Sequence, residues 1–168
     1  MRDYVITVNS TVDVPKLWLE ERHVPVVALK YTIDGETYTD MEGLTAKEFF
    51  EKLREGKMSV TSQVNPEEAM EALEPFVKEG KDILHLGFSS GLSGTLNSMR
   101  LAEAVWLLRE DNVKIGLLCE KSGFRDARYF SQVFKKAFGC SPGEFRKNAG
   151  QQKNHSIKSI LELIQEKK

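Results

Sequence analysis

Residues 89–111 read SSGLSGTLNSMRLAEAVWLLRED, and within this stretch a loop gives way to a helix. Serine and glycine dominate the first residues, and glycine allows the backbone to come close to a ligand. Leu101, Val105 and Leu108 then recur at helical spacing, so one side of the helix is expected to be buried. The start of such a helix suits a small anion, because unpaired amides and the positive end of the helix dipole lie there. We expect the rest of the chain to be organised around this loop and helix.

The composition is that of a soluble globular protein. Of the 168 residues, 40% are hydrophobic and 29% are charged, which argues against disorder. We find no signal-peptide pattern and no apolar run near the ~20 residues of a membrane helix. We therefore expect a cytoplasmic protein without a membrane span, in which Cys119 and Cys140 are free thiols.

The charge is unevenly distributed along the chain. Residues 1–95 contain 10 Lys and Arg against 17 Asp and Glu, whereas residues 96–168 contain 14 against 8. The basic half is a candidate for nucleic-acid binding. The alternative is that its charges form an ordinary solvated surface.

Residues 1–95 alternate between strand-like and helix-like segments. Expected strands cover residues 4–8, 24–33 and 82–88, and expected helices cover 15–21, 46–55 and 66–78. Asp34-Gly35 predicts a hairpin turn, Phe49, Phe50 and Leu53 are expected to face inward, and residues 59–66 read as a polar loop. This alternation predicts an α/β fold, with a partial parallel sheet covered by helices.

Ligands of such sheets bind beyond the carboxyl ends of the strands. Three polar segments would gather there, at residues 9–11, 61–63 and 89–95. They offer hydroxyl and backbone N–H donors without a fixed charge, which suits a carboxylate or a phosphate. The alternative is that these serines and threonines only cap helices.

The three segments read NSTVDVP (9–15), TSQ (61–63) and SSGLSGT (89–95), and together they resemble the N-terminal portion of the DegV family. Members of that family bind fatty acids. The resemblance implies that Thr61 and Ser93 hydrogen-bond a fatty-acid carboxylate, with Ser62, Gly94 and Thr95 nearby and Ser10 as a further candidate. Asn9 stands where the family usually has Asp. The resemblance stops after Thr95, so we expect a shorter or more open acyl channel.

Residues 113–121 and 126–138 are predicted to form two helices joined by a turn that contains Gly123. In the second helix the apolar positions, expected on one face, are Phe130, Val133, Phe134, Ala137 and Phe138. The opposite face is basic and carries Gln132. This pattern is typical of a helix-turn-helix, whose second helix enters the DNA major groove. An ordinary amphipathic surface helix is the alternative.

The same region resembles the second helix-turn-helix of AraC-family transcription regulators. The resemblance rests on GF (123–124), YFS (129–131), FKK (134–136), FG (138–139) and SPGEFR (141–146), and residues 96–108 resemble that family's linker helix. It implies that Ala127, Arg128, Tyr129 and Gln132 face the bases of double-stranded DNA. Lys135 and Lys136 would contact phosphates, and Asp126 would cap the helix.

We expect three parts: a DegV-like α/β portion (1–95), an all-α helix-turn-helix portion (96–150) and an amphipathic C-terminal helix (151–168). The long connecting helix that begins near residue 96 would be shared between the first two parts. The last part carries an apolar stripe, which could pack back on the molecule or pair with a second copy in a homodimer. The stripe consists of Ile157, Ile160, Leu161 and Ile164.

No pattern of catalytic residues or metal ligands stands out. His23, His85 and His155 are far apart in the sequence, and His85 is expected to be a packed, hydrogen-bonded residue. We therefore expect a protein that is not an enzyme and that has no cofactor, with a fatty acid or another small anion as its ligand.

The favoured interpretation is a DNA-binding transcription regulator with a lipid-binding portion. One alternative is a fatty-acid carrier in which the helix-turn-helix is only structural. The other is a hybrid chain that retains neither activity.

Overall fold

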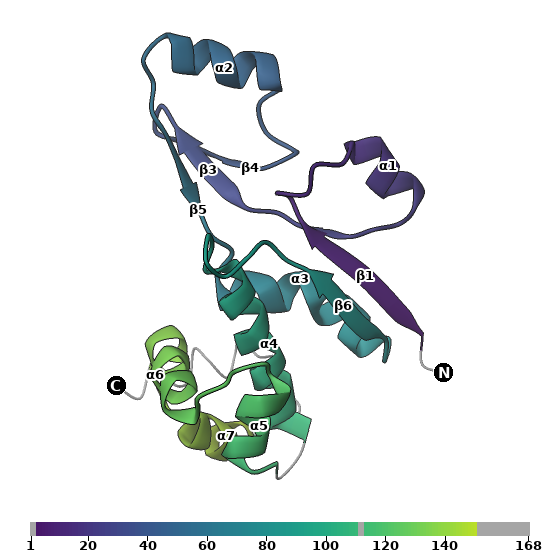
Figure 1. Cartoon of the computed structure of the whole chain (residues 1–168), viewed down its shortest axis with the longest axis vertical. Helices are drawn as coiled ribbons and strands as arrows, with labels where there is room; N and C mark the ends of the chain where they lie inside the picture. Colours follow the sequence, from purple (N-terminus) through teal and green to yellow (C-terminus); the bar gives the residue numbers. More distant parts are fainter. Residues whose placement is uncertain (1–2, 111–112, 151–168) are drawn as a thin grey trace. The chain divides into compact units, whose positions relative to one another are not determined.

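The computed structural model of the chain describes residues 3–110 and 113–150 (Figure 1). It divides into two compact units, Met1–Asn97 and Ser98–Lys168, called here the first and the second unit. This division falls two residues beyond the boundary expected at residue 95. The expected C-terminal helix with its apolar stripe lies outside the described residues.

The first unit contains a parallel three-stranded sheet in the order β2-β1-β6. Its strands are β1 (Tyr4–Asn9), β2 (Val26–Val27) and β6 (Asp82–Leu86). Helix α1 (Lys16–Glu21) follows Pro15 and buries Leu19, and helix α3 (Pro66–Lys78) packs against β6. Both β1 and β6 end in polar loops at the same edge of the sheet, because parallel strands point the same way.

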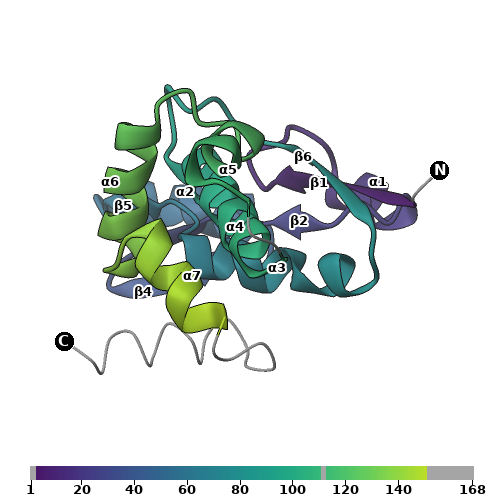
Figure 2. The ribbon, with the colours of Figure 1, turned by 90° about the horizontal axis from the view of Figure 1, so that it is seen from below.

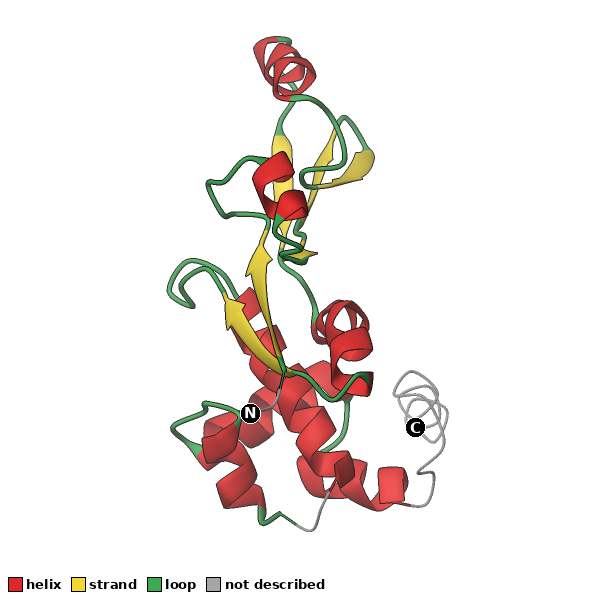
Figure 3. Ribbon diagram, turned by 90° about the vertical axis from the view of Figure 1, so that its right-hand side faces the viewer, coloured by secondary structure: helices red, strands yellow, loops and turns green. Residues whose placement is uncertain are grey.

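A second, antiparallel sheet in the order β4-β3-β5 belongs to the same unit (Figure 3). Its strands are β3 (Lys30–Ile33), β4 (Glu36–Thr39) and β5 (Ser59–Ser62). Asp34 and Gly35 both have positive φ, +57° and +80°, as a two-residue hairpin turn between β3 and β4 requires.

This second sheet corrects two sequence predictions. Residues 24–33 form two short strands in different sheets, and residues 59–62 of the expected loop pair with β3 as β5. Strand β5 was missed because its sequence SVTS has no alternation of apolar and polar residues, the usual sign of a half-buried strand.

Helix α2 (Ala46–Arg54) begins at the capping box formed by Thr45 and Glu48. The Phe49 ring meets the Tyr31 ring edge-on, with centroids 5.4 Å apart. Phe50 was expected to face inward, but its side chain is 53% exposed. Adjacent helical residues point about 100° apart, so the helix cannot place both rings on β3.

The second unit is helical. It contains α4 from Ser98 onward (α4 spans Thr95–Glu110), α5 (Ile115–Lys121), α6 (Ala127–Phe138) and α7 (Pro142–Gly150). Helix α6 packs against both α5 and α7 (Figure 2). The core of the unit consists of five buried rings in mutual contact, those of Phe124, Phe130, Phe134, Phe138 and Phe145. Ala137, expected inside, is exposed.

Gly123, in the turn between α5 and α6, has φ +74°, and a Cβ there would lie 3.2 Å from Arg100 Nε. We expect Gly123→Ala to destabilise the second unit by roughly 1–2 kcal/mol, because the left-handed conformation is costly for a residue with a side chain. Gly116 in α5 is the matched control, since its Cβ would meet nothing within 4 Å. Gly116→Ala should stabilise by about 0.5–1 kcal/mol. Urea unfolding followed by circular dichroism measures both, and equal shifts would contradict the prediction.

Candidate functional site

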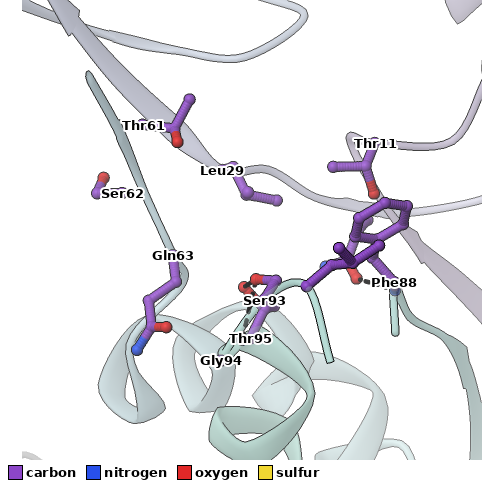
Figure 4. Close-up of a pocket in the computed structure, with 11 residues that line it drawn as sticks. Thr11, Leu29, Thr61, Ser62, Gln63, Phe88, Ser93, Gly94 and Thr95 are labelled. Atoms are coloured by element: carbon purple, nitrogen blue, oxygen red, sulfur yellow. Dashed lines mark hydrogen bonds between the residues drawn. The ribbon is translucent and has the colours of Figure 1, made fainter. Parts of the chain in front are cut away.

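A cavity of about 650 Å³ lies at the edge of the parallel sheet where β1 and β6 end. We call it the polar cup. It contains five of the six predicted ligand residues: Thr61, Ser62, Ser93, Gly94 and Thr95. The remaining lining residues are Asn9, Thr11, Leu29, Gln63, Phe88 and Leu92. Figure 4 shows Thr11, Thr61 and Ser93 around the space into which Leu29 also projects.

Hydrogen bonds position the hydroxyls at the base of the cup. Ser93 Oγ accepts the Thr95 N–H at 3.2 Å and donates to Thr95 Oγ1 at 3.0 Å. Thr95 Oγ1 also accepts the Val64 N–H at 3.3 Å. Because a hydroxyl has two lone pairs and one hydrogen, these two contacts leave the Thr95 hydrogen to donate. Such a donor suits an anion.

Asn9, at the end of β1, links this strand to β2 and to the loop after β6. Its Oδ1 accepts the Phe88 N–H at 3.2 Å, and its Nδ2 donates to the Val27 carbonyl at 3.4 Å. The side chain is buried at the end of β1. Aspartate could accept from Phe88 but could not donate to Val27, so the amide links β1, β2 and the loop after β6 in a way that the carboxylate would not.

Ser10 does not line the cup. Its Oγ accepts the Leu29 N–H at 3.0 Å, and the residue is buried. Three apolar residues of the cup, Leu29, Phe88 and Leu92, were not predicted, because isolated apolar residues in loops carry no recognisable pattern. Gln63 belongs to the TSQ motif (61–63) and lies against Gly94. A Cβ added to Gly94 would be 2.0 Å from Gln63 Oε1.

Every residue that lines the cup is uncharged. An anion would therefore be stabilised by hydroxyl and amide donors and by the N-terminus of α4, a helix of 16 residues that begins at Thr95. The lining has the uncharged composition expected from the sequence, and the binding of an anion there stays a prediction.

His85 lies on β6, and its Nδ1 is 2.9 Å from Thr7 Oγ1. Burial lowers the pKa of the imidazole, which favours its neutral form. Within residues 3–110 and 113–150, no group of three or more His, Cys, Asp or Glu side chains could hold a metal ion. Over the same ranges, no helix is long and apolar enough to cross a membrane.

In the second unit, α6 presents a polar face opposite its buried Phe130, Phe134 and Phe138. All six predicted DNA-contacting residues are exposed, namely Ala127, Arg128, Tyr129, Gln132, Lys135 and Lys136. The expected cap is present, since Asp126 Oδ1 accepts the Tyr129 N–H. Gly139 ends the helix with φ +74°. The turn after α5 and the exposed face of α6 form a helix-turn-helix.

Two family profiles match the chain. Residues 3–116 match the profile of the DegV family of uncharacterised proteins. Residues 85–148 match the profile of a helix-turn-helix domain. Both matches include residues 85–116, so the whole of α4 is part of each.

Curated relatives share the DegV region. A DegV domain-containing protein of Clostridium perfringens is 44% identical over 104 residues, which are 61% of this chain and 36% of the relative. A DegV domain-containing 15.5 kDa protein of Staphylococcus aureus is 31% identical over 98 residues, 58% of this chain and 70% of the relative. The chain spans only about a third of the Clostridium relative and of another from S. aureus.

Solved structures agree on the fold. A fatty-acid-binding DegV family protein from Thermus thermophilus matches 99% of this chain and 53% of its own, with a TM-score of 0.57 and 24% identity. A Thermotoga maritima protein described as revealing a fatty-acid-binding function matches 79% of this chain and 57% of its own, with a TM-score of 0.53 and 26% identity. The chain belongs to the DegV family and also carries an AraC-type helix-turn-helix, whose match overlaps the end of the DegV match.

Proposed function

We propose that the protein is a DNA-binding transcription regulator whose DegV portion binds a fatty acid or a related carboxylate. The observation that carries this proposal is the position of α4. Its first residue, Thr95, lines the polar cup, and the same helix continues to Glu110 within the helix-turn-helix unit.

The fatty-acid part of the proposal is supported by the cup itself. Thr61, Ser93 and Thr95 border one cavity at the start of a helix, where a carboxylate can accept several hydrogen bonds. The solved relatives from T. thermophilus and T. maritima are described as binding fatty acids.

The DNA part is supported by α6. Arg128 can donate two hydrogen bonds to guanine, and Gln132 can pair with adenine. Lys135 and Lys136 would neutralise phosphates and fix the position of the protein along the duplex. All four side chains are exposed, so DNA could reach them without unfolding the core.

A carboxylate bound at Thr95 would order the first turn of α4 and so alter the free energy of the helix that leads into the second unit. Couplings between two binding sites are typically 1–3 kcal/mol, about 5- to 150-fold in affinity. By linkage, DNA would change the affinity for the carboxylate by the same factor.

Titration of duplex DNA, at low and raised salt and with and without oleate, tests the proposal. We expect micromolar or tighter binding that weakens with salt and changes when oleate is added. Oleate binding without DNA binding would favour the carrier, in which the helix-turn-helix is only structural. Failure of both ligands to bind would favour a hybrid chain that has lost both activities.

Removing two hydroxyls from the cup tests the carboxylate site. We expect Thr61→Val with Ser93→Ala to weaken oleate binding by about 1.5–3 kcal/mol for each lost hydrogen bond to the carboxylate. Thr37→Val is the control, because Thr37 is exposed on β4 and does not line the cup. Isothermal titration calorimetry gives the affinities, and equal affinities for the double variant and the control would show that the carboxylate binds elsewhere.

A further inference from the structure

The parallel sheet of the first unit has one face that is open to solvent. The register of β1 and β6 pairs Ile6 with Leu84. Paired residues of neighbouring strands share a face, and successive residues alternate between the two faces. Four large hydrophobic side chains therefore gather on one face, and 37–65% of each is exposed: Tyr4, Ile6, Leu84 and Leu86. We call these four residues the open face.

The opposite face of the same strands is covered. Thr7 is buried there, and Val5, Ile83 and His85 are half-buried. Helix α3 packs against β6, and it does so on this covered face. Parallel sheets normally carry helices on both faces, so an uncovered apolar face on such a sheet needs an explanation.

Helix α1 is too short to cover the open face. Strands β2 and β6 flank β1 on opposite sides, so right-handed connections place α1 and α3 on opposite faces of the sheet. Helix α1 has six residues, a length of about 9 Å, whereas the six residues of β1 span about 20 Å. It can therefore cover only one end of its face, where Val8 is buried.

The two strands carry Asp, Glu, Lys or Arg only at their starts. Asp82 begins β6, and Asp3 and Lys81 directly precede the strands. Residues 8–12 and 86–95, at the other end, contain none of these residues. If two open faces stacked with their strands antiparallel, each charged end would meet an uncharged end. The two Asp82 carboxylates would then lie about 13 Å apart along the strands, beyond the Debye length of ~8 Å at physiological salt.

We propose that the open face is a dimer interface, on which the open face of a second copy packs about a two-fold axis with its strands antiparallel. A two-fold axis brings the same patch to itself. An apolar centre with charges at its rim is the usual composition of such a patch. Two short strands offer less area than the ~800 Å² per partner of a standard interface, so we expect a weak dimer. The interface uses no residue of the polar cup or of α6, and the inference goes beyond the proposed function.

Sedimentation velocity of the full chain, without DNA or carboxylate and from low to high micromolar concentration, tests the interface. We expect a monomer–dimer equilibrium that raised salt does not weaken, because apolar contacts are not screened. Leu84→Lys should weaken the dimer by about tenfold or more, because it would bury an unpaired charge. Val60→Lys is the matched control, since Val60 is 68% exposed on β5 of the other sheet.

Tyr4→Lys provides a second variant in case Leu84→Lys disturbs the fold, because Tyr4 is the most exposed of the four residues. Circular dichroism should show an unchanged fold for it, and its dimer should also be weaker. A wild type that stays monomeric over the whole range overturns the inference. So does a dimer that both open-face variants form as tightly as Val60→Lys does, which would place the interface elsewhere, for example at residues 157–164. Neither outcome bears on oleate or DNA binding, so the proposed function is tested separately.

Discussion

Replacing both Arg128 and Gln132 with alanine is expected to abolish sequence preference in DNA binding. Each lost base contact should cost about 1–3 kcal/mol in affinity for the preferred duplex. Both side chains are exposed on α6, opposite its buried rings, so their removal should leave the fold intact. Selection from a random duplex library, followed by fluorescence anisotropy on the enriched and a scrambled duplex, measures the effect.

Lys135→Ala is the matched control for this prediction, because Lys135 is exposed on the same helix. A lost phosphate contact should weaken binding to the enriched and the scrambled duplex alike, and reduce the salt slope by about one unit. If the double variant enriches the same sequences as the wild type, Arg128 and Gln132 do not contact bases.

The helices could be predicted from the sequence because their signals are local. Helix α3 occupies the expected residues 66–78, begins at a capping box formed by Asn65 and Glu68, and has a proline in its first turn. The ends of α6 are equally clear, with Asp126 before it and Gly139 after it. Such signals lie within a few residues of the helix end.

The strands were harder to predict because their partners are distant in the sequence. Lys30 pairs with Thr39 on one side and with Ser62 on the other. Residues 24–33 were predicted as one strand, largely apolar at first and then alternating, but β2 and β3 belong to two sheets and are separated by Ala28 and Leu29. Strand pairing depends on tertiary context more than helix formation does.

Five of the six ligand residues predicted from the sequence line one cavity, and their role in binding stays a prediction. Thr61 and Ser93 belong to short motifs that resemble those of a known family, and they border one cavity. A second cavity of the first unit is lined by Tyr31, Leu44 and Phe49, which come from a strand, a loop and a helix and share no motif. They line one cavity only because β3 pairs with β5 and α2 covers them.

A single helix-turn-helix contacts fewer phosphates and bases than a pair, so its affinity for DNA should be lower and its salt dependence shallower. A dimer would bring a second copy of α6 to the DNA. The apolar stripe expected at residues 157–164 remains a candidate for such pairing, and the concentration dependence of DNA binding would reveal it.

Phe134→Ala is expected to unfold much of the second unit. The Phe134 ring is fully buried, with centroids 5.7 Å from Phe130, 4.6 Å from Phe138 and 5.7 Å from Phe145. Truncating a buried phenylalanine to alanine typically costs 3–5 kcal/mol, a large fraction of the roughly 5–15 kcal/mol that stabilises a whole domain. Urea unfolding followed by circular dichroism should show the loss, and DNA binding should fall with it.

Leu117→Ala is the control for this variant, because Leu117 lies on α5 with 47% of its side chain exposed. Its cost should be well below that of Phe134→Ala, since less apolar surface leaves the core. Every residue of the polar cup belongs to the first unit, so Phe134→Ala should retain oleate binding after losing DNA binding. Parallel loss of both ligands would show that the first unit depends on the second for its fold, and equal unfolding midpoints for the two variants would contradict the assignment of Phe134 to the core.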